Sequence, residues 1–227
     1  MLVTCLLIAA ASASLLVGAG HVTELNVDEE QPIRTLIGNV RENPDVMDLL
    51  TAGESLRFNL RFSSGRYELF AVDDRSGDLY TSRRIDREQL CPGLSTCSVE
   101  LDITVLPLRV YRILKVVVNV VDINDNSPSF PQPRVTLEIK ESSAIGSQIA
   151  VPAAEDADVG QFGVQRYELS QSSDSGEVFR LSVSAERGPS LTVVRRLDRE
   201  HQPRHSLTLS ACDGGSPAKS GSVDIQV

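Results

Sequence analysis

Short stretches in which polar and apolar residues alternate recur along the chain and predict β-strands. Arg57–Phe62 (RFNLRF) alternates strictly, and Val99–Val105 (VELDITV), Val135–Ile139 (VTLEI) and Ser206–Ala211 (SLTLSA) do the same. A strand with one buried and one exposed face has this period of two residues. No segment shows a sustained apolar period of 3.6 residues, so the pattern indicates an all-β chain.

Turn-forming residues separate the predicted strands. They lie at 63–65 (SSG), 75–78 (RSGD), 174–176 (DSG) and 213–217 (DGGSP). Gly, Asp, Ser and Pro favour turns because they adopt or stabilise turn backbone conformations. Short strands at regular spacing are typical of a β-sandwich.

The chain contains two copies of one unit. RRIDRE at Arg83–Glu88 recurs as RRLDRE at Arg195–Glu200, 112 positions later. Glu29 in VDEEQP and Glu141 in IKESSA are also 112 positions apart. Two markers at one offset indicate duplicated domains of roughly 110 residues, a period too long for a solenoid repeat.

The seam between the copies follows a run of valines. Val116–Val121 is expected to be the last strand of the first copy, and DINDN at 122–126 follows it directly. Pro128 restricts the backbone after this polar cluster. We therefore expect a first domain over 21–122, a linker over 123–128 and a second domain over 129–227. The chain ends within what is expected to be the second domain's final strand, so we expect that domain to be truncated.

The first twenty residues carry no charge and end in small residues. Gly18, Ala19 and Gly20 follow the apolar run MLVTCLLIAAASASLLV. This pattern favours a cleaved secretory signal over 1–20, with a mature chain starting near His21, over a membrane anchor. No later apolar stretch is long enough to span a bilayer, so we expect any membrane span to lie C-terminal to this fragment, which alone would be secreted.

Composition narrows the functional classes. The formal net charge of −9 argues against nucleic-acid binding and is compatible with binding of divalent cations, although a merely acidic surface also fits it. No GxSxG, P-loop, HExxH or dinucleotide fingerprint is present, so the sequence does not predict an enzyme. A calcium-dependent hydrolase is the alternative from that class, and no nucleophile–base pair supports it.

Three cysteines remain after the predicted signal, which contains Cys5. Cys91 and Cys97 bracket the short loop CPGLSTC, which in a secreted protein favours a local disulfide over a zinc site. Closing so small a loop is expected to contribute about 2 kcal/mol to stability. Cys212 is then either a buried apolar residue or a free thiol.

The DINDN cluster has the chemistry of a cation site. Hard dications take six to eight oxygen ligands from carboxylates, amides and backbone carbonyls. Successive residues of an extended linker point to opposite sides, so one linker can serve ions on both sides. An EF-hand is excluded because Ser127 replaces its turn glycine and Pro133 its final glutamate. The remaining alternative is a purely structural polar turn.

Together these motifs resemble a known family. DxNDNxP at the seam, DRE in mid-domain, a Glu near the start of each copy and DAD after the seam resemble the extracellular repeats of cadherins. LCPGLSTC after DRE and the run SPSFP resemble protocadherins, in particular the non-clustered delta type. The resemblance covers essentially the whole mature chain. It implies two tandem Greek-key, Ig-like β-sandwiches joined by a calcium-binding linker.

The resemblance also implies three calcium ions at the seam, which share several of their ligands. The first ion takes Glu29, Asp86, Glu88 and Asp125. The second takes Glu29, Glu88, Asp122, the Ile123 carbonyl, Asp125 and Asp158. The third takes Asn124, the Asn126 carbonyl, Asp156, Asp158 and Asp213.

Two parts of the expected pattern are incomplete. Phe162 stands where the family usually has Asn, a position whose backbone oxygen binds the third ion, so we expect a weaker third site. The second copy's Glu141, Asp198 and Glu200 match half of a further junction, for which this chain has no linker.

The family implies calcium-dependent, homophilic cell–cell adhesion at the plasma membrane, with another copy in trans as the partner. The chain contains no Trp, so the exchange of an N-terminal Trp between partners, used by some cadherins, is excluded and recognition through sandwich faces is expected. The alternative is a calcium-stiffened spacer that binds a different partner or only bears load.

Overall fold

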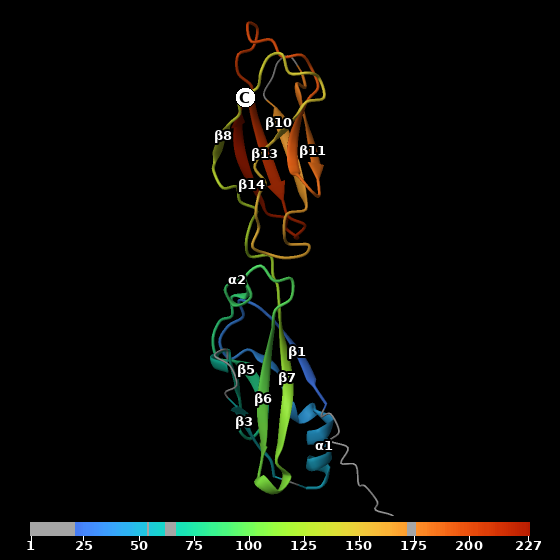
Figure 1. Cartoon of the computed structure of the whole chain (residues 1–227). Helices are drawn as coiled ribbons and strands as arrows, with labels where there is room; N and C mark the ends of the chain where they lie inside the picture. The colour runs from blue at the N-terminus through green and yellow to red at the C-terminus, as the bar shows by residue number, and fades with distance from the viewer. Residues whose placement is uncertain (1–20, 54, 62–66, 172–175) are drawn as a thin grey trace, which may run out of the picture.

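The computed structural model describes residues 21–53, 55–61, 67–171 and 176–227. The chain forms two β-sandwiches placed end to end, with a single extended linker between them (Figure 1). The predicted signal peptide, 1–20, lies outside the described residues, as does the predicted turn at 63–65. None of the helices within the described ranges is long and apolar enough to serve as a membrane span.

The first sandwich consists of a four-stranded and a three-stranded sheet. The chain crosses from one sheet to the other repeatedly, as Greek-key sandwiches do. The larger sheet has the order β1 (Thr23–Asp28), β7 (Arg112–Val121), β6 (Ser98–Leu106), β3 (Arg57–Arg61), and the smaller β2 (Leu36–Asn39), β5 (Asp78–Thr81), β4 (Phe70–Val72).

The second sandwich repeats this arrangement and has its own core. The larger sheet has the order β10 (Arg166–Gln171), β13 (Ser206–Cys212), β14 (Ser220–Gln226), β8 (Arg134–Thr136), and the smaller β11 (Phe179–Ser184), β12 (Gly188–Val193), β9 (Gln148–Ala150). The prediction of an all-β fold with two tandem sandwiches is confirmed.

Side-chain alternation on the paired strands builds the cores. On β6 and β7, Leu101 lies opposite Val116, and both are buried. The next pair, Asp102 and Lys115, points outward and forms an ion pair at 2.6 Å. The predicted strands at 99–105, 116–121 and 206–211 lie within observed strands, and the strand predicted at 57–62 is observed as β3 up to Arg61, the last described residue there.

One predicted strand is shorter than expected. Strand β8 ends at Thr136, whereas the alternation of VTLEI predicted a strand through Ile139. Strand β8 pairs in parallel with β14 as far as Gln226, and the backbone N–H and carbonyl of the next residue, Val227, pair with His205 instead. A last hydrogen bond joins the Leu137 backbone N–H to the Gln226 carbonyl at 2.8 Å.

The structure contains short helices that hydrophobic periodicity did not reveal. The longer is α1 (Pro44–Thr51), whose N-terminus is capped by the Asn43 side chain, which accepts a hydrogen bond from the Asp45 backbone N–H at 2.9 Å. Eight residues are too few for a clear apolar period, but the Asn-Pro start is a recognisable capping signal. The others are α2 (Arg87–Leu90) and the 3-10 turns η1 (Val40–Glu42), η2 (Tyr67–Leu69) and η3 (Leu108–Val110).

The imidazole of His205 in the second sandwich is partly buried, and we expect it to make the stability of this sandwich depend on pH. Its ring meets the Phe179 ring edge to face at a centroid distance of 5.4 Å. Burial lowers the pKa of His205 below its usual 6.5. The unfolded chain therefore takes up this proton at higher pH than the folded one, so the contribution to stability is complete above about pH 6.5 and is lost as the pH falls below it.

NMR titration of the imidazole is expected to give a midpoint below 6.5, and a His205→Gln variant is expected to lose less stability between neutral and mildly acidic pH than the unsubstituted chain. A midpoint at or above 6.5 would contradict this prediction.

Candidate metal centre at the junction of the two sandwiches

Acidic residues from distant parts of the sequence meet where the two sandwiches join. One carboxylate oxygen from each of Glu29, Glu88 and Asp122 lies within 4.8 Å of the other two. The same holds for Glu88, Asp125 and Asp158, a group that combines residues before and after the linker. These residues come from the positions that follow β1 and β7, from helix α2, from the linker and from the loop between β9 and β10 of the second sandwich.

Glu29 lies at the centre of this cluster and is fully buried, with 0% of its surface exposed. Its Oε2 accepts a hydrogen bond from the Arg87 backbone N–H at 2.7 Å, and its Oε1 accepts one from the Ile123 backbone N–H at 3.1 Å. Burial, together with the adjacent Glu88, raises the pKa of Glu29 to about 7 against the effect of these two hydrogen bonds. Glu29 thus joins helix α2 to the linker.

Helix α2 supplies two further carboxylates. The Asp86 side chain caps the helix by accepting a hydrogen bond from the Gln89 backbone N–H at 2.8 Å. Burial raises the pKa of Glu88, and the charge of Asp122 adds to the effect. The negative charge of Asp86 also contributes to the raised pKa of Asp125 in the linker, after burial and Asp158.

The linker is hydrogen-bonded to the second sandwich. Asp122 Oδ2 accepts a hydrogen bond from the Val159 backbone N–H at 2.8 Å. Asn126 donates from its backbone N–H at 3.1 Å and from Nδ2 at 2.7 Å to the Asp158 carboxylate. Asn124 Nδ2 donates to the Pro217 carbonyl at 3.3 Å, in the loop before β14. The linker side chains therefore contact both sandwiches.

The second sandwich contributes Asp156, Asp158 and Asp213. Asp213 is fully buried, and its Oδ1 accepts backbone hydrogen bonds from Gly215 at 3.0 Å and Lys219 at 2.8 Å. Although burial opposes it, these bonds lower the pKa of Asp213. Burial and the charges of Asp158 and Asp213 raise the pKa of Asp156, despite a hydrogen bond from the Asp158 backbone.

Buried side-chain oxygens without a hydrogen bond lie among the predicted ligands. A buried carboxylate or amide oxygen with no hydrogen bond costs free energy unless another group satisfies it. Every such side-chain oxygen in the described part of the chain belongs to a residue predicted to be a metal ligand. They are Asp122 Oδ1, which lies 3.5 Å from the Arg87 guanidinium, Asn124 Oδ1, Asp156 Oδ2 and Asp213 Oδ2. The donor set therefore fits a hard, oxygen-binding dication.

The predicted backbone ligands are less clearly defined. The Ile123 carbonyl accepts a hydrogen bond from the Asp125 backbone N–H at 2.9 Å and retains a second lone pair. Phe162 is half-buried in the loop after Asp158, where its backbone N–H donates to the Val159 carbonyl at 3.1 Å. The roles of both carbonyls, and that of Asn126, stay predictions.

Glu141, Asp198 and Glu200 do not join this cluster. They are exposed at the opposite end of the second sandwich, where Glu141 and Asp198 line one shallow pocket. Asp198 Oδ1 accepts hydrogen bonds from the Glu200 and His201 backbone N–H groups at 3.0 and 3.1 Å.

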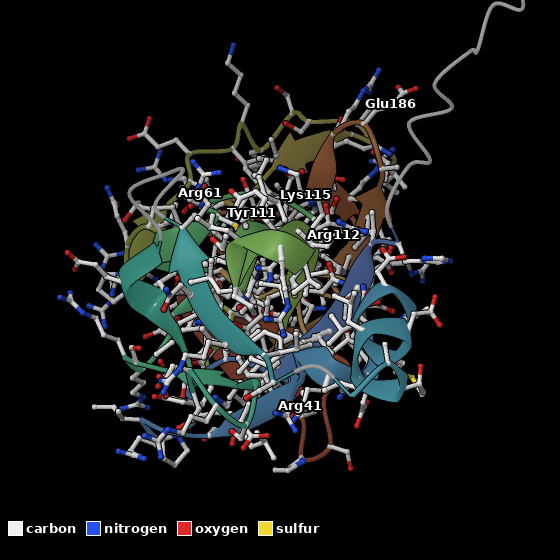
Figure 2. The ribbon with its side chains drawn as sticks, turned by 90° about the horizontal axis from the view of Figure 1, so that it is seen from below. Arg41, Arg61, Tyr111, Arg112, Lys115 and Glu186 are labelled. Carbon is white, nitrogen blue, oxygen red and sulfur yellow. A yellow bond between two sulfur atoms is a disulfide. The ribbon has the colours of Figure 1, made fainter. Side chains whose placement is uncertain are left out.

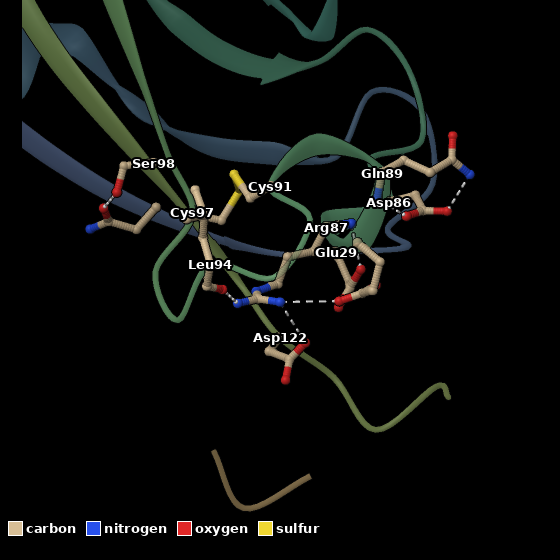
Figure 3. The surroundings of a disulfide bond; sticks show 11 residues. Glu29, Asp86, Arg87, Gln89, Cys91, Leu94, Cys97, Ser98 and Asp122 are labelled. Carbon is tan, nitrogen blue, oxygen red and sulfur yellow. Dashed lines mark hydrogen bonds and ion pairs between the residues drawn. A yellow bond between two sulfur atoms is a disulfide. The ribbon is translucent and has the colours of Figure 1, made fainter. Parts of the chain in front are cut away.

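Arg87 is not among the residues that the sequence predicted for this site. Its side chain is only 2% exposed and lies among the acidic groups (Figure 3). Its place in the repeated DRE motif, between two predicted ligands, was the signal that could have pointed to it.

The cysteine predictions have separate outcomes. The Cys91–Cys97 disulfide is confirmed, with the two Cα atoms 5.7 Å apart (Figure 3). Cys212 is buried at the end of β13 and forms no disulfide within the described residues.

Comparison with known protein families matches both halves of the chain. A model of the cadherin domain matches residues 135–227, and a cadherin-like model matches residues 22–106. Together they match more than half of the chain.

Individual relatives are protocadherins. Human protocadherin gamma-A11 is 36% identical over 203 residues, which are 89% of this chain and 21% of that protein. Human protocadherin-11 X-linked is 34% identical over 211 residues, 88% of this chain and 15% of that protein. The chain thus spans about a fifth or less of the length of these curated relatives. Their similar identities do not separate the expected delta type from the gamma type.

Solved structures agree with this result. The crystal structure of protocadherin gamma C5 EC1-3 superposes with a TM-score of 0.76 at 35% identity, covering 90% of this chain and 64% of the other. The mouse clustered PcdhgC3 EC1-3 structure gives a TM-score of 0.73 at 33% identity, with the same coverage.

Proposed function

The chain belongs to the cadherin family, and on this premise we propose that it is a calcium-dependent adhesion module. Its repeats are residues 21–122 and 129–227, and residues 123–128 form the linker between them. The module acts on the extracellular side of the cell surface, as part of an adhesion receptor ectodomain. The observation that carries the proposal is a set of buried side-chain oxygens that have no hydrogen bond and lie among carboxylates from both repeats.

The proposed junction holds three calcium ions through the carboxylates of both repeats and the linker. When bound, calcium supplies six positive charges and satisfies oxygens that hydrogen bonds leave unpaired. Glu29 and Glu88 serve the two ions nearer the first repeat, and Asp156 and Asp213 serve the ion on the second. Asp125 and Asp158 lie between them and connect the ion positions.

This arrangement makes the angle between the repeats dependent on charge neutralisation. Two like charges 4 Å apart repel by about 4 kcal/mol at an effective dielectric constant of 20. Glu88 belongs to the first repeat and Asp158 to the second, and their oxygens lie in one group within 4.8 Å. Without a cation, repulsion favours separation of the repeats and a loose hinge. With the cation, the same carboxylates hold the repeats together.

We further propose that the module recognises another copy of the same protein in trans through sandwich faces. Strand β7 exposes Ile113 and Val121, at 42% and 41%, on the outer face of the larger sheet. At the end of that sheet Tyr111 lies between two arginines, because Arg61 Nη1 donates to its hydroxyl at 3.5 Å and Arg112 Nη1 to its carbonyl at 3.0 Å (Figure 2). Exposed aromatic, arginine and aliphatic side chains are typical of protein interfaces.

Calcium titration tests the junction. Calorimetry on residues 21–227 is expected to detect three ions, and small-angle scattering is expected to show a narrower range of molecular dimensions with calcium than with chelator. Absence of ion uptake would reject the calcium mechanism. Uptake of only two ions would reject the third site, where Phe162 departs from the family pattern.

Asp156→Asn is expected to have opposite effects with and without calcium. Without calcium it removes a charge that burial and two aspartates disfavour, while Oδ1 can still accept the Asp158 N–H, so the melting temperature is expected to rise by about 2–5 °C. With calcium it removes a ligand charge, so affinity is expected to fall at least about tenfold. Melting scans in chelator and calorimetry in calcium measure the two effects; an unchanged affinity would contradict the ligand role.

Bead aggregation tests self-recognition. Beads densely coated with residues 21–227 are expected to aggregate in calcium and disperse in chelator, because many weak contacts act together. Ile113→Asp is expected to reduce aggregation while leaving calcium uptake unchanged. Beads that take up calcium and remain dispersed would reject homophilic recognition and favour the spacer function.

A further inference from the structure

Arg87 is a buried cation inside the proposed calcium junction. Its side chain is 2% exposed, and Nη1 lies 3.1 Å from Glu88 Oε1 and 3.5 Å from Asp122 Oδ1. Its Nη2 donates a hydrogen bond to the Leu94 carbonyl at 2.6 Å. A buried guanidinium is stable only when its donors are paired, and here they pair with two proposed ligands and one backbone carbonyl.

The Leu94 carbonyl belongs to the loop closed by the Cys91–Cys97 disulfide. Figure 3 shows the Arg87 side chain extending from α2 between this loop and the linker. One terminal nitrogen of its guanidinium, Nη2, is directed to the Leu94 carbonyl, and the other, Nη1, is directed to the acidic group. The disulfide limits the conformations of the loop and therefore fixes the position of the carbonyl. The loop in turn fixes one end of the guanidinium.

Asp122 continues this chain of contacts into the second repeat. One of its oxygens lies 3.5 Å from Arg87 Nη1, and the other accepts the Val159 backbone N–H at 2.8 Å. The orientation of Asp122 is thus set by the first repeat on one side and by the second on the other. Glu88 and Asp122 also belong to one of the two close carboxylate groups, so their positions decide the spacing of the ligand oxygens.

The second repeat provides an internal comparison. Arg199 occupies the equivalent DRE position, 112 residues after Arg87, and is exposed. That repeat has no CPGLSTC loop after its DRE motif. The motif alone therefore does not bury its arginine, and in the first repeat the disulfide loop lies beside the buried one.

We propose that Arg87 is a positioning residue of the calcium junction, which holds Glu88 and Asp122 in place and couples the disulfide loop to calcium affinity. This inference rests on the proposed calcium function. Arg87 acts through its two carboxylate partners and does not itself touch the ion. Its charge also offsets part of the repulsion among the eight clustered carboxylates.

The first test compares Arg87→Met with Arg83→Met. Arg83 is an exposed residue of the same RRIDRE motif that pairs with Glu68 at 2.6 Å, so it controls for the loss of one arginine. Arg87→Met is expected to weaken calcium binding by about 10–100-fold, as loss of a group that orients metal ligands does, and Arg83→Met by less than about twofold. In calcium-free buffer, amide hydrogen exchange in residues 91–97 is expected to accelerate only in Arg87→Met.

A second set of variants separates positioning from folding. Replacing Cys91 and Cys97 by serine opens the loop without altering Arg87. In a chain that keeps Arg87, this double substitution is expected to weaken calcium binding. In the Arg87→Met variant it is expected to cause no further loss of calcium affinity. Arg87→Lys, which keeps the charge but not the planar fork, is expected to bind calcium with intermediate affinity.

The outcomes distinguish the two proposals. If the unsubstituted chain takes up no calcium, the proposed function fails. If it binds calcium and Arg87→Met binds equally well, the positioning role is overturned. Additive losses from the arginine and cysteine substitutions would overturn the coupling between the loop and the metal centre, and would do so even if Arg87→Met alone weakened binding.

Discussion

The dominant physical constraint in this protein is the crowding of carboxylates at the junction of two sandwiches. Glu29 and Asp213 are fully buried there, and Glu88, Asp125 and Asp158 place oxygens within 4.8 Å of one another. Burial and, to a smaller extent, the neighbouring carboxylates raise the pKa values of Glu29, Glu88, Asp125 and Asp156. The role proposed for calcium is to neutralise this charge.

The polypeptide meets part of that demand itself. Backbone N–H groups of Arg87 and Ile123 bind Glu29, and those of Gly215 and Lys219 bind Asp213. Among the described residues, only the guanidinium of Arg87 brings a full positive charge that is buried within the group. Of the buried oxygens without a hydrogen bond, that of Asp122 lies beside Arg87, and those of Asn124, Asp156 and Asp213 lie on the linker and the second sandwich.

The two copies of the DRE motif show how context changes the role of one sequence. In the first copy, Asp86 caps α2 and Glu88 faces the linker. In the second copy, Asp198 and Glu200 are exposed, and the Asp198 side chain binds only nearby backbone N–H groups. The same residues are thus part of a dense charge cluster in one repeat and of a solvated loop in the other. The difference lies in the segment packed against the motif.

The sequence by itself determined the fold class, the two-repeat organisation and the acidic residues at the seam. Alternation along 57–61 and 99–105 reflects burial of one strand face, and the 112-residue offset relates Glu29 to Glu141 without any structural information. Only the tertiary structure decided that β8 ends at Thr136 and that Arg87 is buried while Arg199 is exposed. These features depend on contacts between segments far apart in the chain, because burial and hydrogen-bond partners are properties of the surroundings and local pattern carries no record of them.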